Sequence, residues 1–161
     1  MCANAGDSRA ALWQGDKCVP LSFDHKPENP QERERIEKAG AQIVNGRVEG
    51  LNLTRSIGDF SHKKIKGIPF NKQPITCMPD IIEVERTGGE ELMIVGCDGI
   101  WEKYGDDHAQ LTMEFREGLK KSHSSDCLKQ FFDRNLNNGE SKTDPLGRDN
   151  MTAVLVEFKK Q

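Results

Sequence analysis

The feature that most constrains the fold of this chain is the apolar run Leu92–Cys97, which Asp98 and Gly99 follow at once. The run closes the segment 90–97 and predicts a strand buried in a sheet. Asp-Gly is a turn signal, so we expect the strand to end there and place the Asp98 carboxylate at a sheet edge. A carboxylate held at such an edge is costly unless a cation compensates it. The run therefore predicts a layered fold and a candidate metal ligand.

Strand and helix patterns occupy separate stretches of the chain, which favours the α+β class. We expect two short strands at the beginning, joined by a turn at Gly6 and Asp7. Further extended segments are predicted at 41–44, 47–53, 80–85, 90–97 and 151–158, and helices at 106–120 and 125–136. Asn45-Gly46 is a strong two-residue hairpin signal. Residues 59–79 carry four glycine or proline residues and several lysines, and they predict a long irregular loop.

A further helix is predicted from Asn29 to Gly40. Asn29 suits the N-cap, and Pro30 suits the first helical position. Glu32 stands where it could close a capping box, and Glu34 and Lys38 form a favourable i,i+4 pair. The helix therefore has both of its end signals, with a narrow apolar face.

Composition limits the class of protein. With 161 residues the chain fits one domain, and its net charge of −3 argues against nucleic acid as a partner. No apolar run approaches the roughly 20 residues that span a bilayer, so we expect no membrane association. The five cysteines are scattered and odd in number, which favours reduced thiols and a cytoplasmic or nuclear location. The four histidines form no metal-binding pattern, so any metal would be held by carboxylates.

Three acidic residues stand where strands meet turns, namely Asp7, Asp98 and Asp149. Each alone has a simpler interpretation: Asp98-Gly99 is most often only a turn, Asp149 could form an Asx turn, and Asp7 could begin a hairpin turn. If they converge, they form an oxygen-rich site that suits Mg²⁺ or Mn²⁺.

Seven motifs containing or flanking these residues occur in one order. They are Ala3-Asn4-Ala5-Gly6-Asp7-Ser8-Arg9, Asp24-His25-Lys26-Pro27, Glu34-Arg35-Ile36 leading to Ala39-Gly40, Arg47-Val48-Glu49-Gly50, Leu53-Thr54-Arg55-Ser56-Ile57-Gly58-Asp59, Cys97-Asp98-Gly99-Ile100-Trp101-Glu102 and Asp149-Asn150-Met151-Thr152. The order resembles the protein phosphatase 2C family of metal-dependent serine/threonine phosphatases, from Ala3 to about Phe158.

The resemblance implies a four-layer α-β-β-α sandwich of two antiparallel sheets flanked by helices, with residues 1–161 as the C-terminal part of that catalytic domain and 60–79 as its flap-like loop. It implies that Asp98 and Asp149 ligate the metals, that Asp7 serves a further, weaker metal site, and that Glu102 shares that site. Two or three Mg²⁺ or Mn²⁺ ions are implied for the complete domain. The implied activity is hydrolysis of phosphoserine and phosphothreonine in proteins by a metal-activated water.

The chain contains no Asp-Gly-His sequence, the family motif that supplies the metal-bridging aspartate and a histidine. His62, His108 and His123 are predicted to be exposed, so we assign no catalytic residue, and no cofactor other than metal. We expect weak metal binding, little or no phosphatase activity from this chain alone, and possible self-association through exposed sheet edges.

One other interpretation remains open. The chain could be a non-catalytic pseudophosphatase or interaction module that binds phosphoproteins or regulators. A nucleotide-binding ATPase is disfavoured because the chain has no G-x-x-x-x-G-K-[ST] sequence.

Overall fold

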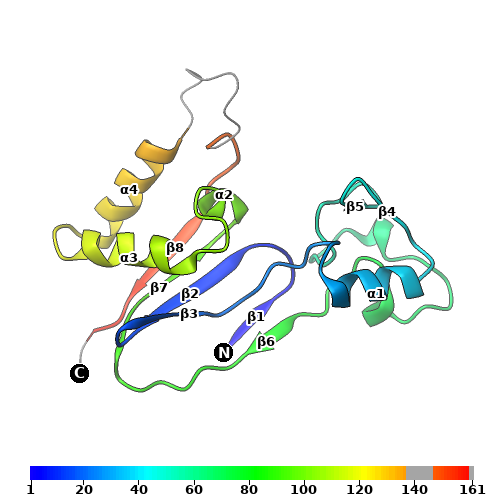
Figure 1. The fold of residues 1–161 in the computed structure, drawn as a ribbon, viewed down its shortest axis with the longest axis horizontal. Coiled ribbons are helices and arrows are strands. Elements are labelled where there is room, and N and C mark those ends of the chain that lie inside the picture. Colours follow the sequence, from blue (N-terminus) through cyan, green and yellow to red (C-terminus); the bar gives the residue numbers. More distant parts are fainter. Residues whose placement is uncertain (137–146, 160–161) are drawn as a thin grey trace. The chain divides into compact units, whose positions relative to one another are not determined.

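The computed structural model describes residues 1–136 and 147–159. The chain divides into two compact units. Unit 1 comprises Met1–Ser8 and Ser22–Ile82, and unit 2 comprises Arg9–Leu21 and the described part of Glu83–Gln161. Both contain antiparallel strands and helices, so the expected α+β class is confirmed (Figure 1). None of the helices in the described residues is long and apolar enough to cross a membrane.

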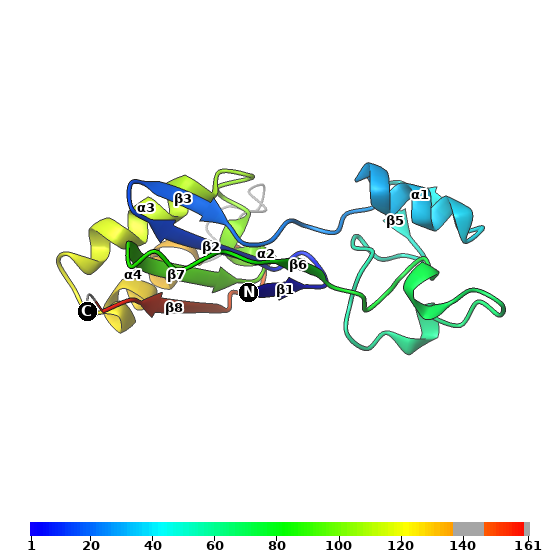
Figure 2. The same cartoon turned by 90° about the horizontal axis from the view of Figure 1, so that it is seen from below.

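Unit 2 is built on an antiparallel sheet of four strands in the order β3-β2-β7-β8, which lie side by side in Figure 2. The strands are β2 (Arg9–Gln14), β3 (Lys17–Pro20), β7 (Glu90–Gly96) and β8 (Ala153–Glu157). The expected continuous burial of β7 is wrong: Leu92 and Ile94 are fully buried, but Val95 is 36% exposed. Burial alternates because the sheet is antiparallel and its two faces differ.

One face of this sheet packs against α3 (His108–Leu119) and α4 (Ser124–Asn135), close to the predicted bounds. A short helix that the sequence did not predict, α2 (Asp98–Trp101), follows β7 directly. The shared core consists of Ala11, Trp13, Leu92, Ile94, Ile100, Trp101, Tyr104, Leu111, Phe115, Cys127 and Phe131. His108 is buried against this core, and its ring lies 5.3 Å from the ring of Trp101. The prediction that His108 is exposed is therefore wrong.

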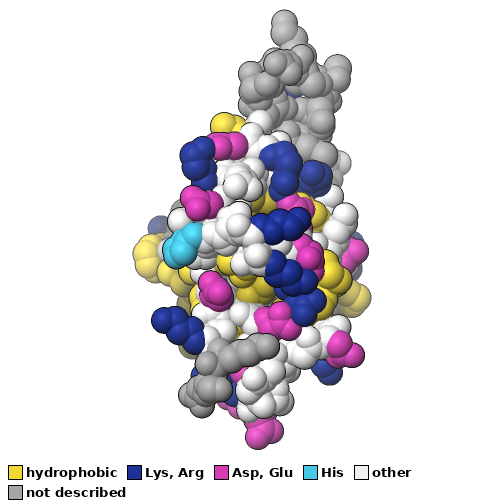
Figure 3. Space-filling view, turned by 90° about the vertical axis from the view of Figure 1, so that its left-hand side faces the viewer, with side chains coloured by type: hydrophobic (Ala, Val, Ile, Leu, Met, Phe, Trp, Pro, Cys, Tyr) yellow, Lys and Arg dark blue, Asp and Glu magenta, His cyan; other side chains and the backbone are white. Residues whose placement is uncertain are grey.

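The outer surface of unit 2 mixes basic and acidic side chains (Figure 3). Lys120 pairs with Glu117 at 2.6 Å, and Lys129 pairs with Asp133. Such exposed pairs contribute little to stability, so the apolar core carries the fold of this unit.

Unit 1 joins a small sheet to a helical and irregular region. Two short strands with a turn at Gly6 and Asp7 between them are confirmed. They do not form a hairpin with each other, because β1 (Cys2–Asn4) pairs with β6 (Asp80–Ile82), so the alternative in which Asp7 begins a hairpin turn is wrong. The predicted Asn45-Gly46 hairpin is confirmed between β4 (Ile43–Val44) and β5 (Arg47–Val48), since both turn residues have positive φ. The segment after Asp59 is irregular apart from the 3₁₀ turns η1 (Phe60–His62) and η2 (Phe70–Lys72), as predicted.

Helix α1 (Pro30–Lys38) begins after Asn29, and Gly40 follows its end with φ of 78°. Its Ile36 packs with Val48 and Ile75 in a second core. The predicted Glu34–Lys38 pair is present at 2.6 Å.

The predicted capping role of Glu32 is wrong. Its carboxylate is 3% exposed and accepts hydrogen bonds from Arg55 at 2.6 Å, from Arg35 at 2.7 Å and from the Thr54 hydroxyl. Burial alone would raise the pKa of Glu32, but these donors outweigh it and lower the pKa to about 2. Glu32 is therefore the acidic centre of a buried ion-pair network.

We predict that Glu32→Gln lowers the stability of unit 1 by about 3 kcal/mol, because it leaves two guanidinium groups without their buried partner. Hydrogen exchange of the α1 amides measures this, and Glu34→Gln, at an exposed pair on the same helix, should leave exchange unchanged.

The pH dependence has a defined sign. The folded-state pKa of Glu32 lies below its ordinary value of 4.5, so its stabilisation is complete above about pH 4.5 and is lost as the pH falls toward 2. Equal acid sensitivity of wild type and Glu32→Gln would contradict this assignment.

Candidate metal site

The antiparallel pairing of β7 with β8 brings two of the predicted metal ligands to one end of a sheet. Gly96 lies opposite Ala153, and just beyond this pair Cys97 N donates to Thr152 O at 3.1 Å. The Cys97 thiol donates to Asn150 O at 3.1 Å, and Thr152 N donates to Cys97 Sγ at 3.2 Å. Asp98 and Asp149 therefore flank a contact between the two strand ends.

Gly99 allows these two segments to approach closely. A Cβ at this position would lie 2.5 Å from Asn150 O and 3.4 Å from Cβ of Asp149. The first distance is too short for any side chain, so the space beside Asp149 requires glycine. The Asp98-Gly99 pair in the sequence indicates only a turn, and no local pattern predicts this role of Gly99.

Glu102 completes an acidic group with Asp98 and Asp149. Burial raises the pKa of Glu102, and the negative charges of Asp149 and Asp98 raise it further. Each aspartate also accepts a local backbone hydrogen bond, Asp98 from Gly99 N at 3.0 Å and Asp149 from Asn150 N at 2.7 Å. Each of these bonds goes to the next residue along the chain, so neither is the i to i+2 bond of an Asx turn, and Asp98 is the first residue of α2.

Asp7 lies in unit 1, in the turn between β1 and β2. It is 9% exposed and forms an ion pair with Lys26, a partner that the sequence analysis did not consider. Its assignment to a further metal site stays a prediction.

The donors fit a divalent cation in kind. Carboxylate oxygens are the ligands that Mg²⁺ and Mn²⁺ prefer, and a cation would relieve the repulsion that Glu102 experiences. Within residues 1–136 and 147–159, however, no three His, Cys, Asp or Glu side chains come together closely enough to hold a metal ion. Among the described residues no complete metal site is present, and the assignment of Asp98, Glu102 and Asp149 as ligands stays a prediction.

Together these features define an α+β protein with an acidic site at a sheet end. The profile of the family described as "Protein phosphatase 2C" matches residues 1–143. A rice protein named "Probable protein phosphatase 2C 11" is 44% identical over 160 residues, and "Protein phosphatase 2C homolog 2" of Schizosaccharomyces pombe is 41% identical over 160 residues. A crystal structure of a Toxoplasma gondii phosphatase superposes with a TM-score of 0.81 at 31% identity, covering 99% of this chain and 47% of that one.

The chain belongs to the protein phosphatase 2C family. It is matched over 98% of its length by both the rice and the yeast relative, but it spans only 43% and 42% of theirs. The resemblance seen in the seven sequence motifs is therefore confirmed, whereas the roles of individual acidic residues stay predictions.

We predict that Gly99→Ala destabilises unit 2 by about 2 kcal/mol, because the added methyl group overlaps Asn150 O. Faster hydrogen exchange of the β8 amides would report the separation of the strand ends. Gly89→Ala is the matched control, since its Cβ would meet nothing closer than 3.4 Å. Equal exchange in both variants would contradict the close-approach role.

We also predict that Asp149→Asn lowers the pKa of Glu102, because one of the two repelling charges is removed. Carbon-detected NMR titration of the Glu102 carboxyl group measures the shift. Asp106→Asn is the control, because it removes an exposed acid that pairs with Arg9 at 3.3 Å. It should leave the pKa of Glu102 unchanged.

Proposed function

We propose that this chain contributes part of the catalytic domain of a protein serine/threonine phosphatase, with Asp98 and Asp149 as ligands of Mg²⁺ or Mn²⁺. The observation that carries the proposal is the close contact between the Asp98-Gly99 and Asp149-Asn150 segments. This contact leaves no room for a side chain at position 99. Membership of the phosphatase 2C family supports the class of reaction.

The residues around the candidate site have separate roles in this proposal. Cys97 and Gly99 hold the two aspartate-bearing segments together. Trp101 is buried and donates from Nε1 to Gly96 O at 3.1 Å, which fixes α2 and the Glu102 that follows it. Glu102 and Asp7 would serve a further, weaker site. When bound, the divalent cations supply an activated water and neutralise the phosphate oxygens.

The proposed substrates are phosphoserine and phosphothreonine side chains of proteins. Two or three ions are proposed for the complete domain, and none of the residues described is assigned as a general acid or base. We propose that residues 60–79 act as the family's flap, in which substrate preference is tuned.

We further propose that the chain alone binds metal weakly and has little or no activity. Support comes from the incomplete set of ligands: within the described residues no three acidic side chains come close enough together to hold a metal ion, and the 161 residues contain no Asp-Gly-His motif to add a bridging ligand.

The test measures phosphate release from a phosphothreonine peptide with excess Mn²⁺, together with calorimetric titration of Mn²⁺. We expect no turnover above the background of Asp98→Ala, and weak Mn²⁺ binding that Asp98→Ala or Asp149→Ala reduces further. A chain extended to the length of the family relatives should gain activity that the same substitutions abolish by about a hundredfold or more.

Two results would contradict parts of the proposal. Robust turnover by the 161-residue chain that Asp98→Ala abolishes would refute its inactivity. An extended chain that binds phosphopeptide but never hydrolyses it would favour the alternative, a non-catalytic binding module.

A further inference from the structure

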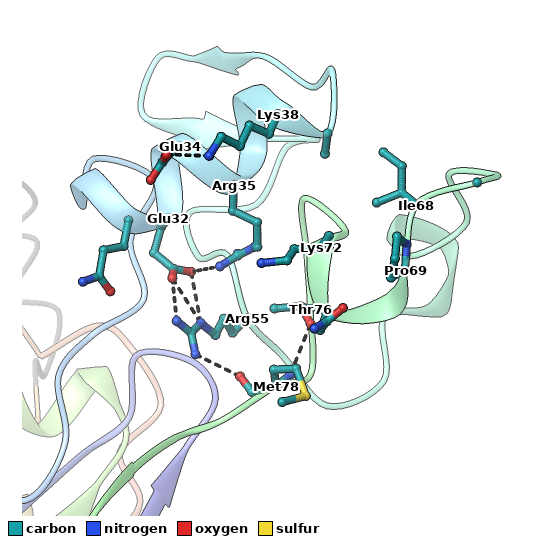
Figure 4. A pocket seen from close by; sticks show the side chains of 14 residues that line it. Glu32, Glu34, Arg35, Lys38, Arg55, Ile68, Pro69, Lys72, Thr76 and Met78 are labelled. Carbon is teal, nitrogen blue, oxygen red and sulfur yellow. Dashed lines mark hydrogen bonds and ion pairs between the residues drawn. The ribbon is translucent and has the colours of Figure 1, made fainter.

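Unit 1 contains a cavity of about 530 Å³ between α1 and the irregular segment that follows Gly67 (Figure 4). Side chains of α1 line one side, and Ile68, Pro69 and Lys72 line the other. Arg55 and Met78 lie at its base. The volume falls within the range of about 300–1,000 Å³ typical of small-ligand sites. The cavity shares no residue with the candidate metal site.

The wall of the cavity that faces α1 is fixed by a buried amide. The side chain of Gln73, which is 3% exposed, accepts a hydrogen bond from Ile65 N at 3.1 Å. It donates to Ile65 O at 2.9 Å and to Ile68 O at 2.7 Å. Because this segment is held before any ligand arrives, binding there costs little conformational entropy.

The same wall is tied to α1 by Arg35, which donates to Gln73 O at 3.1 Å and to Pro74 O at 3.2 Å. Arg35 and Arg55 also share the Glu32 carboxylate. Both guanidinium groups thus have partners within the protein, and they form the wall of the cavity without being available to a ligand.

The charge around the cavity is unbalanced. Four cationic side chains line it, Arg35, Lys38, Arg55 and Lys72, against the two acidic side chains Glu32 and Glu34. Asp80, which binds Arg55 at 2.6 Å from outside the lining, still leaves one positive charge in excess.

Among the described residues, Lys72 is the lining cation without a direct partner. The hydrogen bond from Lys38 lowers the pKa of the Glu34 carboxyl group most, and the charge of Lys72 lowers it further, only from a distance. Within the described part of the chain, the Lys72 ammonium group takes part in no hydrogen bond or salt bridge, whereas Lys38 is paired with Glu34 at 2.6 Å. In Figure 4 the Lys72 side chain points across the cavity toward Arg35. Because the charge of Arg35 is compensated by Glu32, Lys72 is the cation of this pair that is left to meet an anion.

Beside Lys72 the lining is apolar. Ile68 and Pro69 are its neighbours on the same wall, and Met78, 39% exposed, lies at the base. A ligand that contacts both Lys72 and this apolar lining needs an anionic group joined to an aliphatic or aromatic group.

We propose that this cavity binds an organic anion, with a carboxylate or phosphate-type group on Lys72 and an aliphatic or aromatic group against Ile68, Pro69 and Met78. A free small acid and an acidic peptide side chain beside an aliphatic residue share this chemistry. Binding at this site does not depend on phosphatase activity.

The test is an NMR titration of the full 161-residue chain with three probes. They are phenylphosphonate, the blocked dipeptide acetyl-Glu-Leu-amide and its neutral counterpart acetyl-Gln-Leu-amide. We expect saturable shifts at the amides of Ile68 and Lys72 with at least one anionic probe, and at least about tenfold weaker binding of the neutral one. Binding of the phosphonate alone identifies a free small acid as the source, and tighter binding of the acidic dipeptide identifies a peptide.

Two variants make the test specific. Lys72→Ala should weaken the binding of the anionic probe about tenfold, because it removes the cation that would contact the anionic group. Lys64→Ala is the matched control: it removes the same charge from the same loop, is exposed, and lies outside the lining, so binding should not change. The amide spectra of both variants verify that they are folded.

Three results would overturn the proposal: no saturable shift with either anionic probe, equal binding of the neutral dipeptide, or equal weakening by the two lysine variants. The outcome is separate from that of the phosphate-release assay, since no probe here is a substrate and no variant touches an acidic residue of the metal site.

Discussion

The pairing of β7 with β8 is the constraint on which the candidate metal site depends. Antiparallel register places the end of one strand beside the beginning of the other, and hydrogen bonds of Cys97 extend the contact one step beyond the sheet. Gly99 then lets the two backbones meet where any other residue would hold them apart. Acidic side chains separated by about fifty positions in the sequence thereby share one end of a sheet, and the charges of the two aspartates raise the pKa of Glu102.

In unit 1 a charged cluster performs the organising role that apolar contacts perform in unit 2. Glu32 is buried and ionised because Arg35, Arg55 and Thr54 all donate to it, and Arg55 extends the network to Asp80 at the start of β6. His25 joins from the other side, 3.0 Å from Asp80. The apolar cluster around Ile36 is small, and hydrogen-bonded charges connect α1, the irregular segment and the small sheet.

The sequence predicted what depends on local patterns. The Asn45-Gly46 turn, the beginning and end of α1, and the helices α3 and α4 depend on short-range signals, and they were found within a few residues. It did not predict what depends on pairing between distant segments: the partner of β1, the hairpin strand β3, or the burial of Glu32, which a local capping rule explained equally well. His108 was misjudged for the same reason, because only the folded core shows that Trp101 lies beside it.

For the candidate site, the sequence identified Asp98, Glu102 and Asp149, and the structure brings these three into electrostatic contact. The sequence did not show that Gly99 and Cys97 hold the two strand ends together. A residue that acts by leaving space, or by bridging two backbones, has no sequence pattern that predicts this role. Lys26 was missed as the partner of Asp7 because their nineteen-residue separation has no meaning until the turn is folded.

The distribution of aromatic residues has a practical consequence. The chain has two tryptophans and one tyrosine, and all three, Trp13, Trp101 and Tyr104, lie in the core of unit 2. Tryptophan and tyrosine fluorescence therefore reports on unit 2, whereas unit 1, whose benzene rings all belong to phenylalanine, adds nothing to that signal. A single tryptophan introduced into unit 1 would give each unit its own optical reporter within one molecule.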